Sequence, residues 1–189
     1  YAGTQAGLDK ALAPLASLGP PLANQVGPVA YTALQRSGDI SDPRAEGLYL
    51  KGGFVMGLGP ELVDALVDGF RPDPRRASII LFQAGGGAIA RVPSAATAFA
   101  QRDIFANMLV INGWRFGEDP TEHMQAARDH WQELERFTYG FYVNDLMPDA
   151  TTAVIQANYR QNHARLVEVK NKYDPTNLFR MNANIKPSV

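Results

Sequence analysis

Two amide side chains near the end of the chain have the residue type and spacing that best suit ligand binding. Asn182 and Asn184 are two positions apart, so in an extended segment both side chains lie on one face. Each amide offers N–H donors and a carbonyl acceptor. Such a pair can complement the edge of a planar heterocycle that mixes donors and acceptors. The same spacing also fits a C-terminal strand whose asparagines only cap turns, and the spacing alone leaves both open.

The residues before this pair predict how the tail is held. Asp174 precedes Pro175, and a residue before proline is pushed out of the helical region, so a helix should end there. Asn177 is expected to close a turn by bonding to neighbouring backbone. Leu178 and Phe179 are expected to form an apolar plug that fastens the tail to a core.

Other reactive residue types are poorly placed for chemistry. Glycines 85–87 stand between two strand patterns, which predicts a hairpin or bulge and not a phosphate-binding loop before a helix. His123 and His130 lie two turns apart on one predicted helix, with no acidic residue in zinc-site spacing. We therefore expect surface or helix-packing histidines and no metal site. No serine has a Gly-x-Ser-x-Gly setting, so a hydrolase triad is unsupported.

Residues 172–185, KYDPTNLFRMNANI, resemble the C-terminal signature of the berberine-bridge-enzyme-like FAD-linked oxidoreductases, which end in a KYDPxNLFRxNxNI pattern. Shorter stretches agree with the same family in order. They are Gly86-Gly87-Ala88, the TAF-x-x-R of residues 97–102 and the GxYxN of residues 140–144. The resemblance runs from about residue 8 to residue 187, and its final motif is the most specific.

The resemblance implies roles for several residues. The final asparagines of the family lie close to the flavin, so Asn182 and Asn184, together with Asn144, are expected to contact FAD. Tyr142 is the implied general base, because family members use a tyrosine in this stretch. Asp145 stands where a second aromatic residue is usual. Without the family, Tyr142 would be a tyrosine at the edge of a core.

The resemblance also makes the strand after Arg102 a wall of the substrate pocket. Arg102 is expected to anchor the sheet edge or to reach into the substrate cleft, and the alternative is a partner for a surface carboxylate. Plant members carry a polar or acidic residue five places before the strand's tryptophan, and this chain has Leu109 there. The strand thus lacks the carboxylate base of berberine bridge enzyme, which weakens an alkaloid ring-closing reaction. Asn107 and Asn112 are its only polar residues, and Asn107 is expected to line the pocket with Leu109.

Composition indicates an ordinary globular domain. The chain has 189 residues, of which 46% are hydrophobic and 20% charged, and a chain of this size buries roughly 70% of its unfolded surface. The net charge of −1, without a long basic run, argues against nucleic acid and anionic membranes as partners. No apolar run approaches the length of a transmembrane helix, and no start resembles a signal peptide, so we expect a cytoplasmic location. The absence of cysteine excludes disulfides, thiolate metal sites and a cysteinyl flavin link within this chain.

Hydrophobic periodicity and turn residues predict the elements. Helices are expected over residues 4–18, 31–35, 60–70, 120–139 and 161–173, and strands over residues 48–55, 77–82, 88–92, 104–114 and 141–144. Glu122 is expected to cap its helix. The inward residues of the last two helices are predicted to be Met124, Ala127, Trp131, Leu134, Phe137, Leu166, Val169 and Tyr173.

The order of these elements favours an α+β fold, in which helices pack on one face of an antiparallel sheet. The resemblance turns the other face toward the flavin. It implies that residues 1–189 are the substrate-binding, C-terminal domain of an FAD-linked oxidoreductase, preceded by the FAD domain of the same polypeptide. A chain that begins with Tyr1 and not Met fits a piece of something longer.

The implied reaction is oxidation of a small-molecule substrate at a C–H next to a hydroxyl or amine. Hydride would pass to the flavin, with dioxygen as the reoxidant. The alternative from another class is a stand-alone α+β ligand-binding module without redox activity.

The asparagines should also converge in space. Asn144, Asn182 and Asn184 are expected near one edge of the sheet, with Asn107 on a neighbouring strand. In this chain alone we expect that edge to be exposed, with Leu109 uncovered beside it. A homodimer through the exposed sheet face would cover such a surface.

Overall fold

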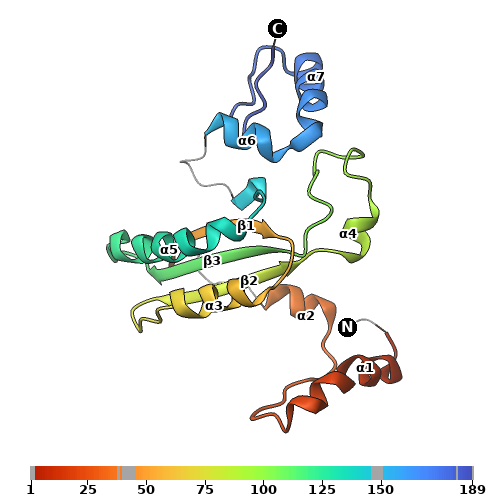
Figure 1. Cartoon of the computed structure of the whole chain (residues 1–189), viewed down its shortest axis with the longest axis vertical. Helices are drawn as coiled ribbons and strands as arrows, with labels where there is room; N and C mark the ends of the chain where they lie inside the picture. The colour runs from red at the N-terminus through yellow and green to blue at the C-terminus, as the bar shows by residue number, and fades with distance from the viewer. Residues whose placement is uncertain (1–2, 38, 40–45, 146–150, 182, 189) are drawn as a thin grey trace. The chain divides into compact units, whose positions relative to one another are not determined.

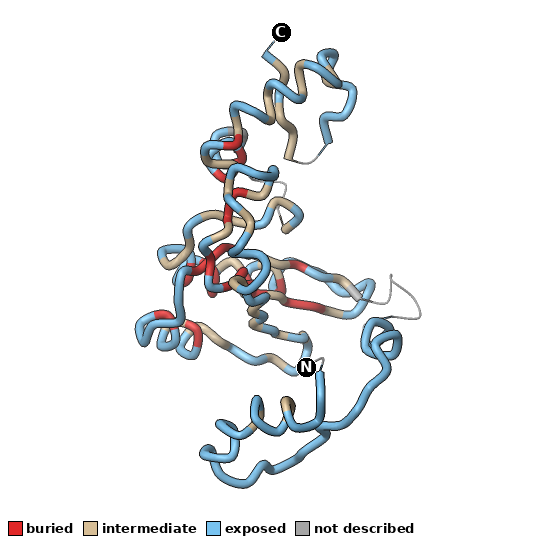
Figure 2. Tube along the Cα trace, turned by 90° about the vertical axis from the view of Figure 1, so that its right-hand side faces the viewer, coloured by how far each residue is buried: buried red, intermediate tan, exposed pale blue. Residues whose placement is uncertain are grey.

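The computed structural model describes residues 3–37, 39, 46–145, 151–181 and 183–188, and it divides into two compact units, residues 1–41 and 42–189. The elements of the first unit are α1 (Gln5–Leu12), the 3₁₀ helix η1 (Ala13–Leu18) and α2 (Tyr31–Arg36). Thr4 caps α1 as expected, since its hydroxyl accepts the N–H of Gly7 at 3.2 Å. No described residue of this unit is buried, as Figure 2 shows.

The second unit is built on a three-stranded antiparallel sheet (Figure 1). The strands are β1 (Glu46–Val55), β2 (Ala77–Ala84) and β3 (Ala106–Arg115), in the order β1-β3-β2. Across the three strands Leu109 lies between Gly52 and Leu81. This arrangement, with helices, confirms the α+β class.

Eight helical segments complete the described part of the second unit. They are α3 (Pro60–Gly69), α4 (Gly87–Arg91), α5 (Thr121–Leu134), η2 (Glu135–Phe137), η3 (Val143–Asp145), α6 (Thr152–Asn158), η4 (Arg160–Asn162) and α7 (His163–Tyr173). Helices α3 and α5 lie along the same face of the sheet in Figure 1, as predicted. We call this the covered face and the opposite one the open face.

The core lies between the covered face and these two helices. Alternate residues of β3 point to opposite faces, so Met108 and Val110 meet the helices while Asn107 and Leu109 point to the open face. The predicted stripe of α5 is confirmed, because Ala127, Trp131 and Leu134 are buried in the core. The complete set of buried core residues is Tyr49, Val55, Leu62, Leu66, Ala106, Met108, Val110, Ala127, Trp131 and Leu134.

The hairpin predicted at glycines 85–87 is wrong. Strand β2 ends at Ala84, and the five-residue helix α4 follows. A side chain at Gly85 would lie 2.3 Å from the carbonyl oxygen of Ile104, and Gly86 has a φ of +77°. The chain therefore turns out of the sheet at a point that only glycine permits, and the alanines that follow favour a helix.

The strand predicted over residues 141–144 is wrong as well. Gly140 has a φ of +129°, and the N–H of Asp145 donates to the carbonyl of Tyr142 at 2.9 Å. These two features close the 3₁₀ turn η3 in place of an extended segment.

Two smaller predictions also fail. Glu122 does not cap α5 but pairs with Arg75 at 3.1 Å, while the carboxylate of Asp119 accepts the N–H of Thr121. Helix α7 is present, but its predicted inward residues Val169 and Tyr173 are exposed.

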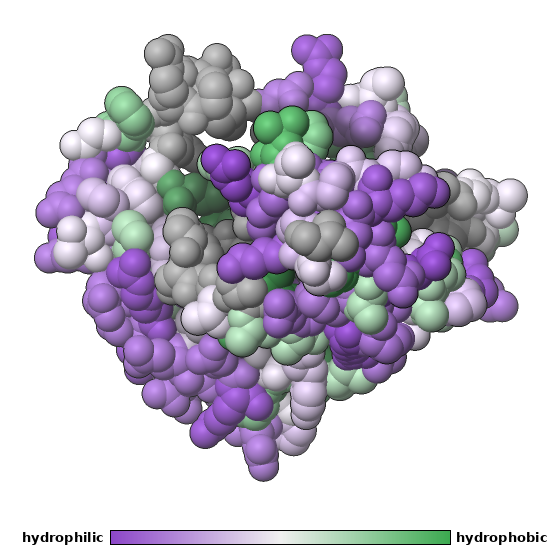
Figure 3. Space-filling view, turned by 90° about the horizontal axis from the view of Figure 1, so that it is seen from above, coloured by the Kyte–Doolittle hydropathy of each residue, from purple (hydrophilic) through white to green (hydrophobic). Residues whose placement is uncertain are grey.

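The surface is mixed in character. In the view of Figure 3, hydrophobic residues lie in small groups among hydrophilic ones. No helix built from the described residues combines the length and the hydropathy that crossing a membrane requires.

Candidate functional site

After α5 the chain passes around the edge of β1 and reaches the open face. The N–H of Phe54 donates to the carbonyl of Gly140 at 2.9 Å, and the N–H of Tyr139 donates to the carbonyl of Phe54 at 2.9 Å. A side chain at Gly53 would lie 2.8 Å from Thr138. Glycine at position 53 therefore lets the two backbones approach, and residues 141–145 are carried onto the open side of the sheet.

A buried amide pair anchors this crossing. Gln101 is almost fully buried, and its Nε2 donates to the carbonyl of Asn158 at 3.1 Å. Asn158 Oδ1 in turn accepts the N–H of Phe141 at 3.0 Å. Gln101 was not singled out from the sequence, so this anchoring role was missed.

A polar row crosses the open face at the end of the sheet where η3 lies. Asn107 Nδ2 on β3 donates to Gln83 Oε1 on β2 at 3.0 Å and to Asp145 Oδ2 at 2.7 Å. Asn107 is 4% exposed, and its Oδ1 has no hydrogen-bond partner among the described residues. The row therefore offers an unused buried acceptor beside a carboxylate.

Asp145 is the functional candidate that sequence reasoning missed. Leu109 does stand where a carboxylate was sought on the strand, yet a carboxylate reaches the same face from η3. The available signal was the departure at position 145 from the family's aromatic residue. That departure could be interpreted only with the turn that brings residues 142–145 over β3.

Tyr142 and Asn144 lie together beside this row. Asn144 Nδ2 donates to the phenol oxygen of Tyr142 at 2.7 Å. The Phe99 ring meets the Tyr142 ring edge-on, with centroids 6.4 Å apart, and it meets the Phe54 ring similarly at 5.9 Å. The structure thus places Tyr142 between an amide and an aromatic wall.

Arg102 holds the loop that carries Phe99. Its Nε donates to the Phe99 carbonyl at 3.0 Å, and its Nη2 donates to the Thr97 hydroxyl at 2.6 Å. Its guanidinium also lies 4.9 Å from the centre of the Phe99 ring. No carboxylate partner of Arg102 is found among the described residues, so the arrangement is that of a structural anchor, and contact with a substrate stays a prediction.

Leu109 is buried, so the expectation that it would be uncovered is wrong. A side chain at Gly52 would lie 2.5 Å from Leu109, which means that Leu109 fills the space left by the glycine of β1. Asn107 is buried too, and it donates hydrogen bonds to Gln83 and Asp145. The exposed residues of this face lie farther along it and include Leu48, Ile79 and Leu81.

The tail after α7 is organised around Asp174. Its carboxylate accepts the N–H groups of Leu178 and Phe179 at 2.7 and 3.0 Å and forms an ion pair with Lys170. The Lys170 hydrogen bond holds the pKa of Asp174 below its usual value, against the opposing effect of desolvation. Asn177, with a φ of +55°, donates its N–H to the Asp174 carbonyl and closes the predicted turn.

The apolar plug predicted in this tail is not formed. Leu178 and Phe179 are 69% and 78% exposed, because their amides are tied to Asp174 at the end of α7. Asn184 is half-buried, and its Oδ1 has no partner among the described residues. Asn182 lies outside the described residues, so the convergence of the asparagines stays a prediction.

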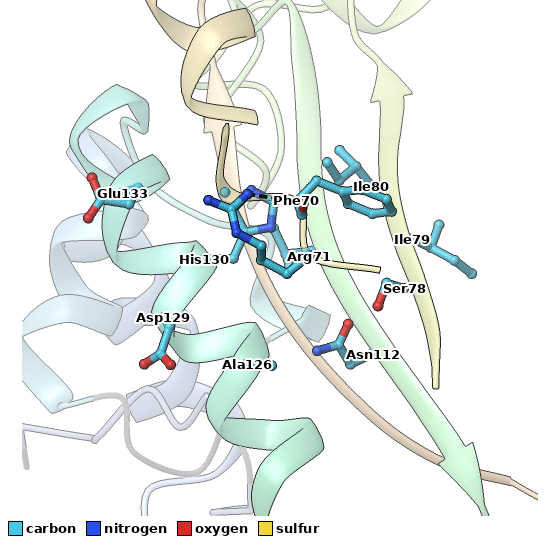
Figure 4. A pocket seen from close by; sticks show the side chains of 12 residues that line it. Phe70, Arg71, Ser78, Ile79, Ile80, Asn112, Ala126, Asp129, His130 and Glu133 are labelled. Carbon is cyan, nitrogen blue, oxygen red and sulfur yellow. Dashed lines mark hydrogen bonds between the residues drawn. The ribbon is translucent and has the colours of Figure 1, made fainter. Parts of the chain in front are cut away.

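The covered face carries a separate cavity of about 270 Å³ (Figure 4). His130 lines it together with Arg71, and burial lowers the pKa of His130, with the charge of Arg71 acting in the same direction. His123 stacks on Trp114, with ring centroids 5.5 Å apart. Both histidines therefore pack helix α5 onto its surroundings, as expected.

Known proteins are similar to this chain in sequence and in fold. Residues 141–186 match the family model described as "Berberine and berberine like". An FAD-linked oxidoreductase of Dictyostelium discoideum is 27% identical over 194 residues, covering 99% of this chain and 41% of the relative. Xylooligosaccharide oxidase of Thermothelomyces thermophilus is 29% identical over 167 residues, covering 79% of this chain and 33% of the relative. The chain is related to the berberine-like FAD-linked oxidoreductases.

A solved structure supports the same relation. Xylooligosaccharide oxidase from Myceliophthora thermophila C1, in complex with xylobiose, superposes with a TM-score of 0.80 at 25% identity. The match covers 100% of this chain and 45% of that one. The chain therefore spans less than half the length of the relatives it matches, and their shared fold agrees with the α+β class found here.

The open side of this chain has groups that suit the cofactor for which its relatives are named. The Tyr142 phenol and the Asn144 amide are exposed there, and both can exchange hydrogen bonds with a flavin ring or a substrate hydroxyl. The donor and acceptor types present thus fit a flavin with a hydroxylated substrate.

Proposed function

We propose that this chain is the substrate-binding portion of an FAD-dependent oxidoreductase whose FAD-binding domain precedes it in the same polypeptide. The observation that supports this best is the polar row on the open face. Gln83, Asn107 and Asp145 come from three separate segments and meet on the only side of the sheet that α3 and α5 leave free among the described elements. The Asp145 carboxylate of this row is half-buried and not sealed, so it can meet a ligand on that side.

Bound FAD would supply the electron acceptor, which takes a hydride from a substrate C–H next to a hydroxyl or amine. The residues of this chain would bind and orient the substrate. Tyr142 and Phe99 would form an aromatic wall, and Arg102 would hold that wall in place. A proton acceptor would come from residues 142–145, where the sequence favours Tyr142.

The cofactor would be held mainly by the preceding domain. From this chain we assign Asn144, Asn182 and Asn184 to its surroundings. Asn144 already donates to Tyr142, so this pair would connect the cofactor side of the site to the substrate side. Dioxygen as the reoxidant is part of the proposal.

Small hydroxylated molecules are the favoured substrates. The structural relative described above binds xylobiose, and amide and carboxylate side chains suit the hydroxyl groups of a sugar. Xylobiose and simple aldoses are therefore the first compounds to test.

The experiment starts from the complete reading frame that encodes this chain. Its purified product should carry yellow FAD, and anaerobic xylobiose or another sugar of the panel should bleach the flavin, with air restoring the colour. Residues 1–189 expressed alone should retain no flavin after desalting. A complete product without flavin that still binds a sugar would instead support the stand-alone binding module.

A further inference from the structure

We infer that Asp145 is the proton acceptor of this site and that Tyr142 acts as a positioning residue. The inference rests on the proposed function. It assigns the role of the base to Asp145 in place of Tyr142, which the sequence favoured. Its starting point is the hydrogen bond of 2.7 Å between Asp145 Oδ2 and Asn107 Nδ2, which fixes a carboxylate over the open face.

The position of Asp145 is defined by the sheet beneath it. A side chain at Gly52 would lie 3.7 Å from Asp145 Cβ, so the aspartate stands over the point where β1 has no side chain. Leu109 fills the neighbouring space and gives the carboxylate an apolar floor. Asp145 Oδ1 has no hydrogen bond within the described residues, so one carboxylate oxygen is held while the other can accept a proton.

The surroundings of Tyr142 are different. Its phenol oxygen already accepts the Asn144 amide at 2.7 Å, and its ring is held edge-on to Phe99. A carboxylate accepts a proton on an oxygen lone pair directly, whereas a phenol O–H must first lose its own proton. A protonated phenol held by Asn144 can instead donate to the substrate oxygen and orient it.

The step is a two-electron oxidation of an alcohol. The substrate O–H bond breaks, and its proton goes to Asp145 Oδ1. The adjacent C–H bond breaks with its electron pair, and the hydride is taken up by oxidised FAD, the acceptor named in the proposed function. The carbon–oxygen bond becomes a carbonyl.

The test measures anaerobic flavin reduction in the complete flavoenzyme with the sugar that bleaches it. Asp145→Asn keeps the shape and the contact with Asn107 but removes the base, and should slow reduction about 100- to 10,000-fold. Tyr142→Phe should slow it less. Asp145→Glu should restore part of the rate. The matched control is Asp64→Asn, which changes an exposed aspartate on α3, the helix that packs on the covered face. It should leave the rate unchanged.

Two further readouts separate chemistry from structure. Flavin absorbance and thermal unfolding of Asp145→Asn should match wild type, so that a slower reduction reports lost chemistry and not a lost fold. A crystal structure of the complete enzyme should show the free Asp145 oxygen lining the cavity in front of the flavin.

The outcomes are distinguishable from failure of the proposed function. A product without flavin, or a flavin that none of the sugars bleaches, rejects the proposed function or its substrate class. A working flavoenzyme in which Asp145→Asn reduces flavin at the wild-type rate rejects the inference. So does a crystal structure in which Asp145 faces away from the flavin cavity, whether or not a substrate is known.

Discussion

The two faces of the sheet differ in what covers them. On the covered face Asn112 Nδ2 donates to the carbonyl of His123 at 2.9 Å, and its neighbours Met108 and Val110 are packed under α3 and α5. On the open face Asn107 is as deeply buried as Asn112, yet its Oδ1 has no partner among the described residues. An unsatisfied buried amide oxygen costs roughly 1–3 kcal/mol. The covered face is packed under two helices, whereas the open face is covered by η3 at one end and exposes Leu48, Ile79 and Leu81 farther along.

This contrast explains why the same strand can serve stability and function. Because successive residues of β3 alternate between the faces, core residues and site residues are interleaved along one strand. Asn107 is held by the hydrophobic packing of Ala106 and Met108 on either side of it. The site is therefore anchored to the core through β3, while α3 and α5 do not cover its outward side.

The largest effect is expected from Met108, which is fully buried on the covered face. Met108→Ala should lower the free energy of unfolding by about 2–5 kcal/mol, since it removes apolar contacts and leaves a cavity. Urea denaturation of the chain measures this value. Met56→Ala, at a half-exposed methionine, is the matched control, and equal losses at both positions would mean that the covered face is not the core.

The second effect concerns the anchor that carries η3 onto the open face. Asn158→Leu removes Oδ1, which accepts the Phe141 N–H at 3.0 Å and Gln101 Nε2 at 3.4 Å, while the bond of Gln101 to the Asn158 backbone carbonyl remains. Leaving the Phe141 N–H unpaired should cost roughly 1–3 kcal/mol in denaturation experiments. Gln132→Leu, at an exposed amide of α5, should cost much less. In the complete flavoenzyme Asn158→Leu should also slow flavin reduction, because Asp145 would lose its fixed position.

The sequence predicts the elements that local patterns determine, and it fails where the structure depends on contacts between residues far apart in the chain. Strands β1 and β3 and helices α3 and α5 were predicted because each carries its own periodic pattern. The strands predicted over residues 88–92, after glycines 85–87, and over residues 141–144 are helical in the structure. Their shapes depend on distant contacts, namely the Ile104 carbonyl for the first and the backbone of Phe54 for the second.

The site was predicted in part for the same reason. Motif resemblance named Tyr142, Asn144, Asn107 and Arg102, and the structure brings the first two together and gives Arg102 a place behind Phe99. It did not name Asp145 or Gln83, whose relation to Asn107 requires the register of β2 with β3 and the turn of η3. The roles of the assigned residues stay predictions.

A smaller effect is expected from the titration of His130 beside the covered-face cavity. Burial lowers its pKa in the folded chain below the ordinary value of 6.5. The unfolded chain therefore binds more protons, so stability is fully present above about pH 6.5 and is lost as the pH falls toward the lowered folded pKa. Removing the group in His130→Gln should flatten the fall of unfolding free energy on the acid side of pH 6.5.

The smallest effect on stability is expected from the exposed part of the open face. Leu81 is 39% exposed and pairs with Leu109 across the strands, so Leu81→Lys should cost less than the roughly 1.5–3 kcal/mol of burying a whole leucine. Its effect on association should be larger, because a charge placed on this face opposes docking of a second copy. If the chain forms a homodimer through the open face, Leu81→Lys should shift it toward monomer in sedimentation velocity. Val67→Lys, on the solvent side of α3, should not. A dimer that survives Leu81→Lys but not Val67→Lys would move the interface to the helices, and the open face would then be free for ligand in both forms.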